Sequence, residues 1–273
     1  MTTQPQTRSD PAEPGTDAAG PRRTGPGKRD DISLAPLVVQ PLAVLAVVVA
    51  VVVYVSTAEL TPTEAGLLSL RSLWSLTVEH MELTAVTTLI VIVVALPSGI
   101  LLTRRRARPA RPVVVGIANF GQAAPAVGLL VLVATVRGVG FWTAVLGLAI
   151  YGALPTLRNT MTGLEQIDPR LVEAGRGMGL SATQTLARVE LPLAVPVIVT
   201  GIRLSLVLIV GTAALAPFIG GGGLGQLIIT GVNLQVDKQL VVGAVLIASL
   251  ALVVDWLGRV FEVIARPRGL SGE

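Results

Sequence analysis

The sequence predicts an all-α membrane protein with about six transmembrane helices. Of its 273 residues, 52% are hydrophobic and only 14% are charged, whereas an ordinary soluble domain contains about 25% charged residues. The mean hydropathy is +0.73. The apolar residues gather in continuous stretches of roughly the 20 residues that a helix needs to cross a bilayer. A transmembrane β-barrel would instead show short segments of alternating hydrophobicity.

Six apolar stretches are long enough to span a membrane as helices. The third and fourth are separated only by Arg137 and Gly138, which predicts a tight helical hairpin. Residues 1–31 are rich in Pro, Gly and charged residues and are expected to form a disordered cytoplasmic tail. Residues 32–265 form the transmembrane domain, and residues 266–273 form a short cytoplasmic tail. The six stretches cover residues 34–55, 83–103, 113–136, 139–157, 193–219 and 240–256.

The distribution of Lys and Arg predicts the orientation of these helices, because cytoplasmic loops retain positive charge. If the N-terminus is cytoplasmic, 17 of the 21 Lys and Arg residues lie on the cytoplasmic side. We therefore expect a multi-pass protein of the bacterial inner (plasma) membrane with both termini cytoplasmic. The basic cluster directly after the second stretch is interpreted as a topology anchor in contact with membrane lipid. It lacks the interleaved aromatics or binding module of a nucleic-acid site, and its members are Arg104, Arg105, Arg106, Arg108 and Arg111.

A polar segment, residues 158–192, separates the fourth and fifth stretches. Asp168 followed by Pro169 is a helix start signal, since the carboxylate caps the helix and proline needs no hydrogen bond in the first turn. Three glycines follow at alternate positions and predict a turn. Ser181 and Gln184 have capping-box spacing, so a second helix is expected to begin there and to end near Leu191 and Pro192. The segment is therefore predicted to be a cytoplasmic helix-turn-helix.

This segment resembles the conserved loop of binding-protein-dependent ABC importer permeases. Their motif reads Glu-Ala-Ala, three residues, Gly, nine residues, Ile, one residue, Leu-Pro. The motif falls in register here, although Gly175 replaces the third Ala and Val189 replaces Ile. Similarity over about residues 119–233 extends to the osmoprotectant subgroup, whose solutes include glycine betaine, carnitine and choline. Similar permeases import other betaine-like compounds such as ergothioneine. The matching residues are Glu173, Ala174, Gly175, Gly179, Leu191 and Pro192.

The resemblance implies a type I ABC importer permease fold in which residues 158–192 form a coupling loop that docks on an ATPase. No G-x-x-x-x-G-K-[ST] motif occurs in the chain, so ATP and Mg²⁺ are expected on a separate ATPase dimer. This chain is expected to bind no cofactor itself and not to be an enzyme. The other implied partners are a second copy of the chain or a related permease, and an extracellular substrate-binding protein. The alternative is a capped amphipathic loop without a partner.

Two further groups are candidates for the translocation pathway or its gate. Residues 220–225 match the dinucleotide pattern G-x-G-x-x-G, but no strand precedes them and no acidic residue follows at the required distance. We interpret these glycines as a bendable outer mouth of the pathway, with a flexible helix exit as the alternative. Amides of the third stretch either line the pathway or bond neighbouring helices, and Pro125 is expected to kink this stretch. The candidates are Asn119, Gln122, Pro125, Gly220, Gly222, Gly223 and Gly225.

Isolated charged residues decide between the remaining function classes. Arg203 is expected to snorkel to the cytoplasmic face, with pairing to a carboxylate or to the coupling loop as the alternative. His80, between Glu79 and Glu82, is interpreted as a surface residue, and no metal or catalytic set is recognisable. An ion-coupled transporter would need carboxylates within the membrane, but only Asp255 lies near a predicted span. A transport subunit is therefore favoured over a secondary transporter and over a membrane-bound enzyme.

Overall fold

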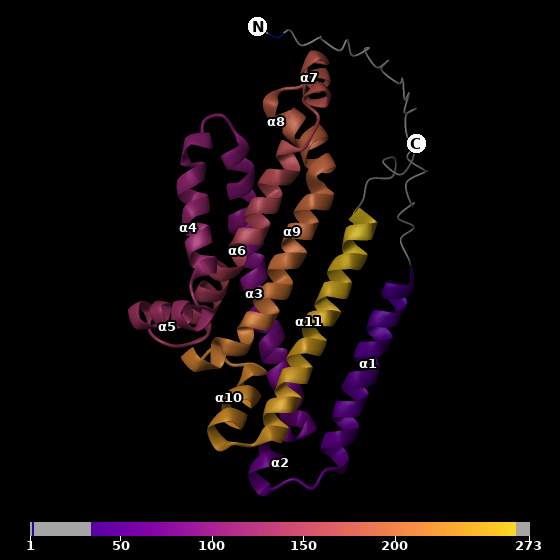
Figure 1. Ribbon diagram of the computed structural model, residues 1–273, viewed down its shortest axis with the longest axis vertical. Coiled ribbons are helices and arrows are strands. Elements are labelled where there is room, and N and C mark those ends of the chain that lie inside the picture. The colour runs from indigo at the N-terminus through magenta and orange to yellow at the C-terminus, as the bar shows by residue number, and fades with distance from the viewer. Residues whose placement is uncertain (1, 3–33, 266–273) are drawn as a thin grey trace. The chain divides into compact units, whose positions relative to one another are not determined.

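The computed structural model describes Thr2 and residues 34–265, and all regular elements in this part of the chain are helical (Figure 1). Both predicted tails, apart from Thr2, lie outside the described residues, and so do residues 32–33. The elements are α1 (Leu34–Thr57), α2 (Pro62–Leu68), α3 (Leu70–Thr103), the 3₁₀ turn η1 (Arg108–Ala110), α4 (Arg111–Ala123), α5 (Ala126–Arg137), α6 (Phe141–Glu165), α7 (Pro169–Gly177), α8 (Ala182–Thr185), the π-helical turn η2 (Leu186–Glu190), α9 (Leu191–Thr212), the 3₁₀ helix η3 (Ala213–Ile219), α10 (Gly225–Leu234) and α11 (Asp237–Ala265).

Five helical segments are long and apolar enough to cross a membrane, and a sixth crossing is possible through the pair formed by α4 and α5. The five contain α1, α3, α6, α9 and α11. The predicted number of about six spans is thus confirmed, as is the all-α class of the described residues. In Figure 1, α7 and α8 lie at one end of the bundle, and α2 and α10 lie at the other. These are called the α7–α8 end and the α2–α10 end below.

The third predicted span is not a continuous helix. The helical run Arg108–Ala123 and the helix Ala126–Arg137 are bent by 107° relative to one another. Pro125 lacks the N–H that would continue the hydrogen-bond ladder of α4, and Ala124 before it is extended. The chain therefore breaks at this point rather than kinking. The turn at Gly138 lies where it was expected. It joins α6 to the short helix α5, which is bent away from α4, rather than to a continuous span.

Three spans are longer than their hydrophobicity indicated, and α6 is one of them, since it continues to Glu165. Helix α3 begins at Leu70, because the side chain of Ser69 caps it by accepting from Ser72 N–H at 3.2 Å. Its 34 residues correspond to about 50 Å at 1.5 Å per residue, beyond the hydrocarbon thickness of about 30 Å. Helix α11 likewise continues to Ala265. Polar residues near the ends of these helices therefore lie on helices rather than in loops.

The core of the bundle is formed by α3, α6 and α9, which approach one another closely. A Cβ atom on Gly201 of α9 would lie 2.4 Å from Asn159 Cβ on α6, and one on Gly99 of α3 would lie 2.8 Å from Thr160 Cβ. Only glycine permits these crossings, as is common where helices pack in membranes. The hydroxyls of Thr156 and Ser205 are 2.8 Å apart in the same interface and are fully buried. These contacts fix α9 against α6.

Candidate functional site

Helix α7 begins as the sequence predicts. The side chain of Asp168 accepts a hydrogen bond from Arg170 N–H at 2.9 Å, and Pro169 occupies the first helical position. The helix ends at Gly177, and Gly179 follows with a φ of 86°. A positive φ is strained for other residues but not for glycine, so Gly179 allows the chain to turn toward α8.

The start of α8 also agrees with the prediction. Ser181 N–H donates to Gln184 Oε1 at 2.9 Å, and Gln184 N–H donates to Ser181 Oγ at 3.3 Å. This is the reciprocal arrangement of a capping box. The predicted helix-turn-helix is therefore present at the α7–α8 end (Figure 1).

The predicted end of the second helix near Leu191 and Pro192 is wrong. Residues Ala182–Ile219 form one helical run, in which α8 continues through η2 into α9. Leu191 N–H bonds to the Leu186 carbonyl, the wider spacing of a π-helix. Pro192 lies in the first turn of α9 and is exposed. The wider turn accommodates the missing proline donor, so the segment that precedes α9 is mechanically continuous with it.

The exposed face of α7 carries an apolar row. Leu171, Ala174 and Met178 are spaced by three and four residues and therefore share one helix face. Leu171 is 48% exposed and Met178 is 77% exposed. Glu173, two residues after Leu171, is exposed on a different side of the helix. The expected coupling residues Glu173 and Ala174 are thus accessible to a partner.

Gly175, next to this row on the helix surface, is buried against α8 and η2. A Cβ atom there would lie 3.4 Å from Val189 Cγ2 of η2 and 3.6 Å from Thr185 Cγ2 of α8. These are ordinary van der Waals distances, so this position packs α7 on the helical run that leads into α9. The glycine that departs from the family motif has room for the alanine of that motif.

Two ion pairs connect the α7–α8 end to neighbouring helices. Arg104, at the end of α3, donates to Glu190 of η2 at 2.5 Å, and the Glu190 side chain is only 8% exposed. Arg111 of α4 pairs with Glu165 at the end of α6. Glu190 was not singled out from the sequence, although a carboxylate directly before the Leu-Pro pair is a recognisable signal. Arg105, Arg106 and Arg108 of the same basic cluster are exposed.

The predicted pathway residues lie in two separate places. Asn119 of α4 accepts a hydrogen bond at 2.7 Å from Arg158 of α6, so this amide connects two helices. Gln122 is half-buried, and Pro125 is exposed at the break before α5. The glycines lie beyond the other end of α5, where Gly140 N–H donates to Ile219 O at 2.7 Å. Their assignment to a pathway remains a prediction.

The glycine-rich stretch forms a turn that requires glycine at several positions. Gly220, Gly222 and Gly223 have φ values of 72°, 74° and 92°. A Cβ atom on Gly225, the first residue of α10, would lie 2.0 Å from Ala214 O. This stretch therefore needs both positive φ and close backbone approach. Residues 220–224 are called the glycine loop below.

The interpretation of His80 as a surface residue is wrong. Its exposed fraction is 0%, and its Nε2 lies 3.1 Å from the Val210 carbonyl of α9. Because α3 begins at Leu70, His80 lies on a helix that packs against α9 rather than in an exterior loop. The sequence could not indicate this, since the flanking Glu79 and Glu82 are exposed.

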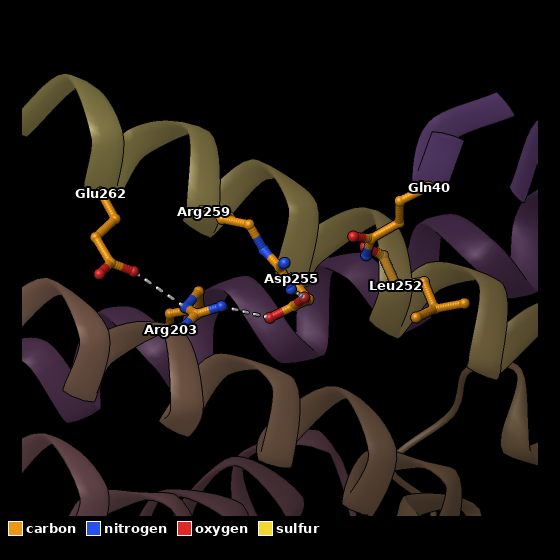
Figure 2. Close-up of polar contacts among 6 residues, drawn as sticks. All are labelled: Gln40, Arg203, Leu252, Asp255, Arg259 and Glu262. Carbon is orange, nitrogen blue, oxygen red and sulfur yellow. Dashed lines mark hydrogen bonds and ion pairs between the residues drawn. The ribbon is translucent and has the colours of Figure 1, made fainter. Parts of the chain in front are cut away.

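Arg203 forms ion pairs with carboxylates instead of snorkelling. Figure 2 shows its guanidinium between Asp255 and Glu262 of α11, at 3.0 Å and 3.5 Å. Its side chain is 18% exposed. The alternative of carboxylate pairing is therefore the correct one. Glu262 was missed because the hydropathy signal ended at residue 256. Within residues 34–265, no group of three or more His, Cys, Asp or Glu side chains is placed to hold a metal ion.

Comparisons with known proteins agree with this architecture. Residues 95–263 match the family described as the binding-protein-dependent transport system inner membrane component. The chain is 38% identical, over 71% of its length and 88% of the relative, to the glycine betaine/carnitine/choline transport system permease protein OpuCB of Bacillus subtilis. It is 40% identical, over 70% of its length and 87% of the relative, to the carnitine transport permease protein OpuCB of Listeria monocytogenes.

A solved structure supports the same assignment. A chain of the inward-facing MetNI methionine ABC transporter superposes with a TM-score of 0.62 at 26% identity, covering 71% of this chain and 95% of that one. The expected ABC importer permease fold is thereby confirmed. The chain belongs to the family of binding-protein-dependent transport system inner membrane components.

Proposed function

We propose that this chain is the permease subunit of an ATP-driven importer for a small quaternary-ammonium osmoprotectant. The proposed class of solute is supported by the names of the relatives. The relatives in Bacillus subtilis and Listeria monocytogenes are named for glycine betaine, carnitine and choline, and OsmW of Salmonella typhimurium, 38% identical, is named for osmoprotectant import. A betaine-like compound such as ergothioneine is the alternative solute.

The exposed row on α7 supports docking of this helix on a separate ATPase. Leu171 and Met178 expose apolar surface at a polar end of the bundle, where burial against a partner would be favourable. Glu173, also exposed on α7, offers a charge for a basic residue of that partner. ATP and Mg²⁺ bind to the ATPase dimer in this proposal, and this chain takes no part in the hydrolysis chemistry.

The continuity of α8, η2 and α9 supports transmission of ATPase motion into the membrane. A displacement of α7 and α8 moves α9, because α8, η2 and α9 form one helical run and Gly175 of α7 packs against that run. The other end of α9 leads through η3 to the glycine loop. ATP-driven closure of the ATPase dimer is thus proposed to act on the far end of the pathway through α9.

The basic residues support a cytoplasmic position for the α7–α8 end. Arg105, Arg106 and Arg108 are exposed there, as the retention of positive charge in cytoplasmic loops predicts. With this orientation both termini are cytoplasmic, and the α2–α10 end faces the binding protein. A second permease, either a copy of this chain or a relative, completes the transmembrane pathway.

Co-purification with the ATPase tests the docking step. We expect Glu173→Lys combined with Gly179→Pro to abolish co-purification and ATP-dependent uptake, because the charge is reversed and the positive φ is lost. The matched control is Arg137→Glu, a charge reversal at an exposed residue of α5, which should leave co-purification unchanged. Retention of ATP-dependent uptake by the double variant would refute docking through α7.

Uptake by the reconstituted complex tests the solute. Proteoliposomes that contain ATP, the ATPase, the binding protein and this chain should accumulate labelled glycine betaine, carnitine or choline. Dissipation of ion gradients by an ionophore should not stop uptake if ATP drives it. Uptake that follows the ion gradient without ATP would instead support a secondary transporter, and uptake of ergothioneine alone would narrow the solute to the alternative.

A further inference from the structure

Two adjacent residues of α3 contact the glycine loop at the α2–α10 end. The carboxylate of Glu79 accepts a hydrogen bond from Gly223 N–H at 3.2 Å. A Cβ atom on Gly222 would lie 3.0 Å from the same carboxylate oxygen, and one on Gly223 would lie 3.0 Å from His80 Nδ1. The loop backbone thus rests directly against both side chains, which only glycine permits.

His80 also holds the end of α9 that leads into this loop. Its Nε2 lies 3.1 Å from the Val210 carbonyl. A carbonyl only accepts, so Nε2 carries the proton in this contact. The residue is fully buried, and its Nδ1 has no hydrogen-bond partner in the structure. One end of the imidazole therefore binds α9 while the other faces Gly223.

We propose that Glu79 and His80 form a latch that positions the glycine loop, and that solute passage requires this position. Glu79 is exposed on α3, so its bond to Gly223 N–H can open without unpacking the helix. His80, fully buried, supplies the fixed surface to which the loop returns. Both residues are positioning residues: they act on solute passage by holding the glycine loop in place.

The latch lies at one end of an α3–α9 pair that is also tied at the other end. Arg104 of α3 pairs with Glu190 directly before α9, while His80 of α3 contacts Val210 near the end of α9. Because α9 is tied to α3 at both ends, a displacement of α9 at the α7–α8 end also acts on α3 and reaches its contact with the glycine loop. The inference rests on the proposed function, because the latch would connect ATPase docking at the α7–α8 end to the glycine loop at the α2–α10 end.

A single spectroscopic label can report the loop position, because the chain contains no cysteine. Gln226, exposed one residue after the start of α10, is replaced by cysteine and spin-labelled in the full chain assembled with its ATPase. Glu79→Ala should increase the mobility of the label. It should also lower the uptake rate about three- to tenfold, as expected for the loss of one hydrogen bond. ATPase co-purification should stay unchanged.

Two matched variants separate a latch from a general structural effect. Glu79→Gln keeps an oxygen that can accept from Gly223 N–H and should restore both label mobility and uptake. Glu82→Ala removes the same charge one turn along α3 and should leave both unchanged. Unchanged label mobility in Glu79→Ala, or equal effects of Glu79→Ala and Glu82→Ala, would overturn the latch. If no quaternary-ammonium solute is imported but the label still responds only to Glu79, the proposed solute fails and the latch stands.

Discussion

Arg203 Nη1 lies 3.0 Å from Asp255 Oδ1, and this ion pair connects α9 to α11 (Figure 2). Glu262 lies 3.5 Å from the same guanidinium, and Arg259 donates to Asp255 at 2.8 Å. The four side chains carry two positive and two negative charges. Charged groups within spanning helices are costly unless they are paired, so the pairing explains how α9 tolerates an arginine in its middle.

Removal of Arg203 should therefore destabilise the bundle. Arg203→Gln leaves two carboxylates without their shared partner, and we expect a loss of roughly 2 to 4 kcal/mol, slightly below the value for a fully buried pair. The double variant Arg203→Gln with Asp255→Asn should lose less than the sum of the single variants. Denaturant unfolding in detergent measures this, with Arg137→Gln, at an exposed residue of α5, as the control. Strict additivity would show that the pair is not coupled.

Glu64 should make stability depend on pH at the α2–α10 end, outside the spanning helices. Thr61 N–H donates to its carboxylate at 2.7 Å and, with a smaller contribution from Lys238, holds the pKa of Glu64 below its ordinary value. The unfolded chain then binds this proton more readily, so ionised Glu64 stabilises the fold at neutral pH. This contribution disappears as the pH falls through the lowered pKa.

The role of Glu64 can be checked by comparing the unfolding of the natural chain with that of Glu64→Gln at two pH values. The difference in unfolding midpoint between the natural chain and the variant should be largest at about pH 7 and should shrink at about pH 3. Lys238→Met should retain most of this dependence, because the Thr61 N–H is the larger contribution. A difference that stays constant over this range would contradict the role of Glu64.

Gly175→Ala should stabilise α7. The added methyl group meets Val189 and Thr185 at van der Waals distances, and alanine exceeds glycine in helix propensity by about 1 kcal/mol. Gly179→Ala is the matched comparison, since the φ of 86° should make it destabilising by roughly 1 kcal/mol. Thermal unfolding of both variants checks these opposite effects on stability, and co-purification with the ATPase shows whether docking is kept. A destabilising Gly175→Ala would show that α7 packs differently from the arrangement described.

Gly225→Ala should be far more damaging than Gly66→Ala. A Cβ atom on Gly225 would lie 2.0 Å from Ala214 O, whereas nothing lies within 4 Å of one on Gly66 of α2. The former substitution must move backbone, and overpacking of this kind costs about 1 to 3 kcal/mol or more. Yield and unfolding midpoint in detergent measure the difference. Equal tolerance at both positions would mean that α10 is free to move away from η3.

Local signals allowed much of this structure to be predicted. Asp168 and Pro169 start α7, and Ser181 with Gln184 starts α8, because each cap involves residues only two or three positions apart. Continuous apolar stretches likewise predicted the spans, since hydrocarbon requires every backbone group to be bonded within its own helix. The glycines at alternate positions predicted the turn at Gly179, whereas the coupling role of Glu173 and Gly179, implied by the family motif, stays a prediction.

Features that depend on distant residues could not be predicted in this way. The break at Pro125 depends on where α5 packs against α6 and η3, although proline itself is visible in the sequence. Leu191 and Pro192 continue a helix because a π-helical turn absorbs the missing donor. His80 is buried because Val210 and Gly223, each more than a hundred residues away, lie against it.

The sequence by itself determined that this chain crosses the membrane about six times, which family it belongs to and where α7 begins. These properties follow from composition, from motif spacing and from hydrogen bonds between near neighbours. Only the tertiary structure decided that Arg203 pairs with Asp255 and that α3 holds the glycine loop. Such contacts depend on which helices lie side by side, and the energy of a buried polar group depends on its partner more than on its own sequence neighbours.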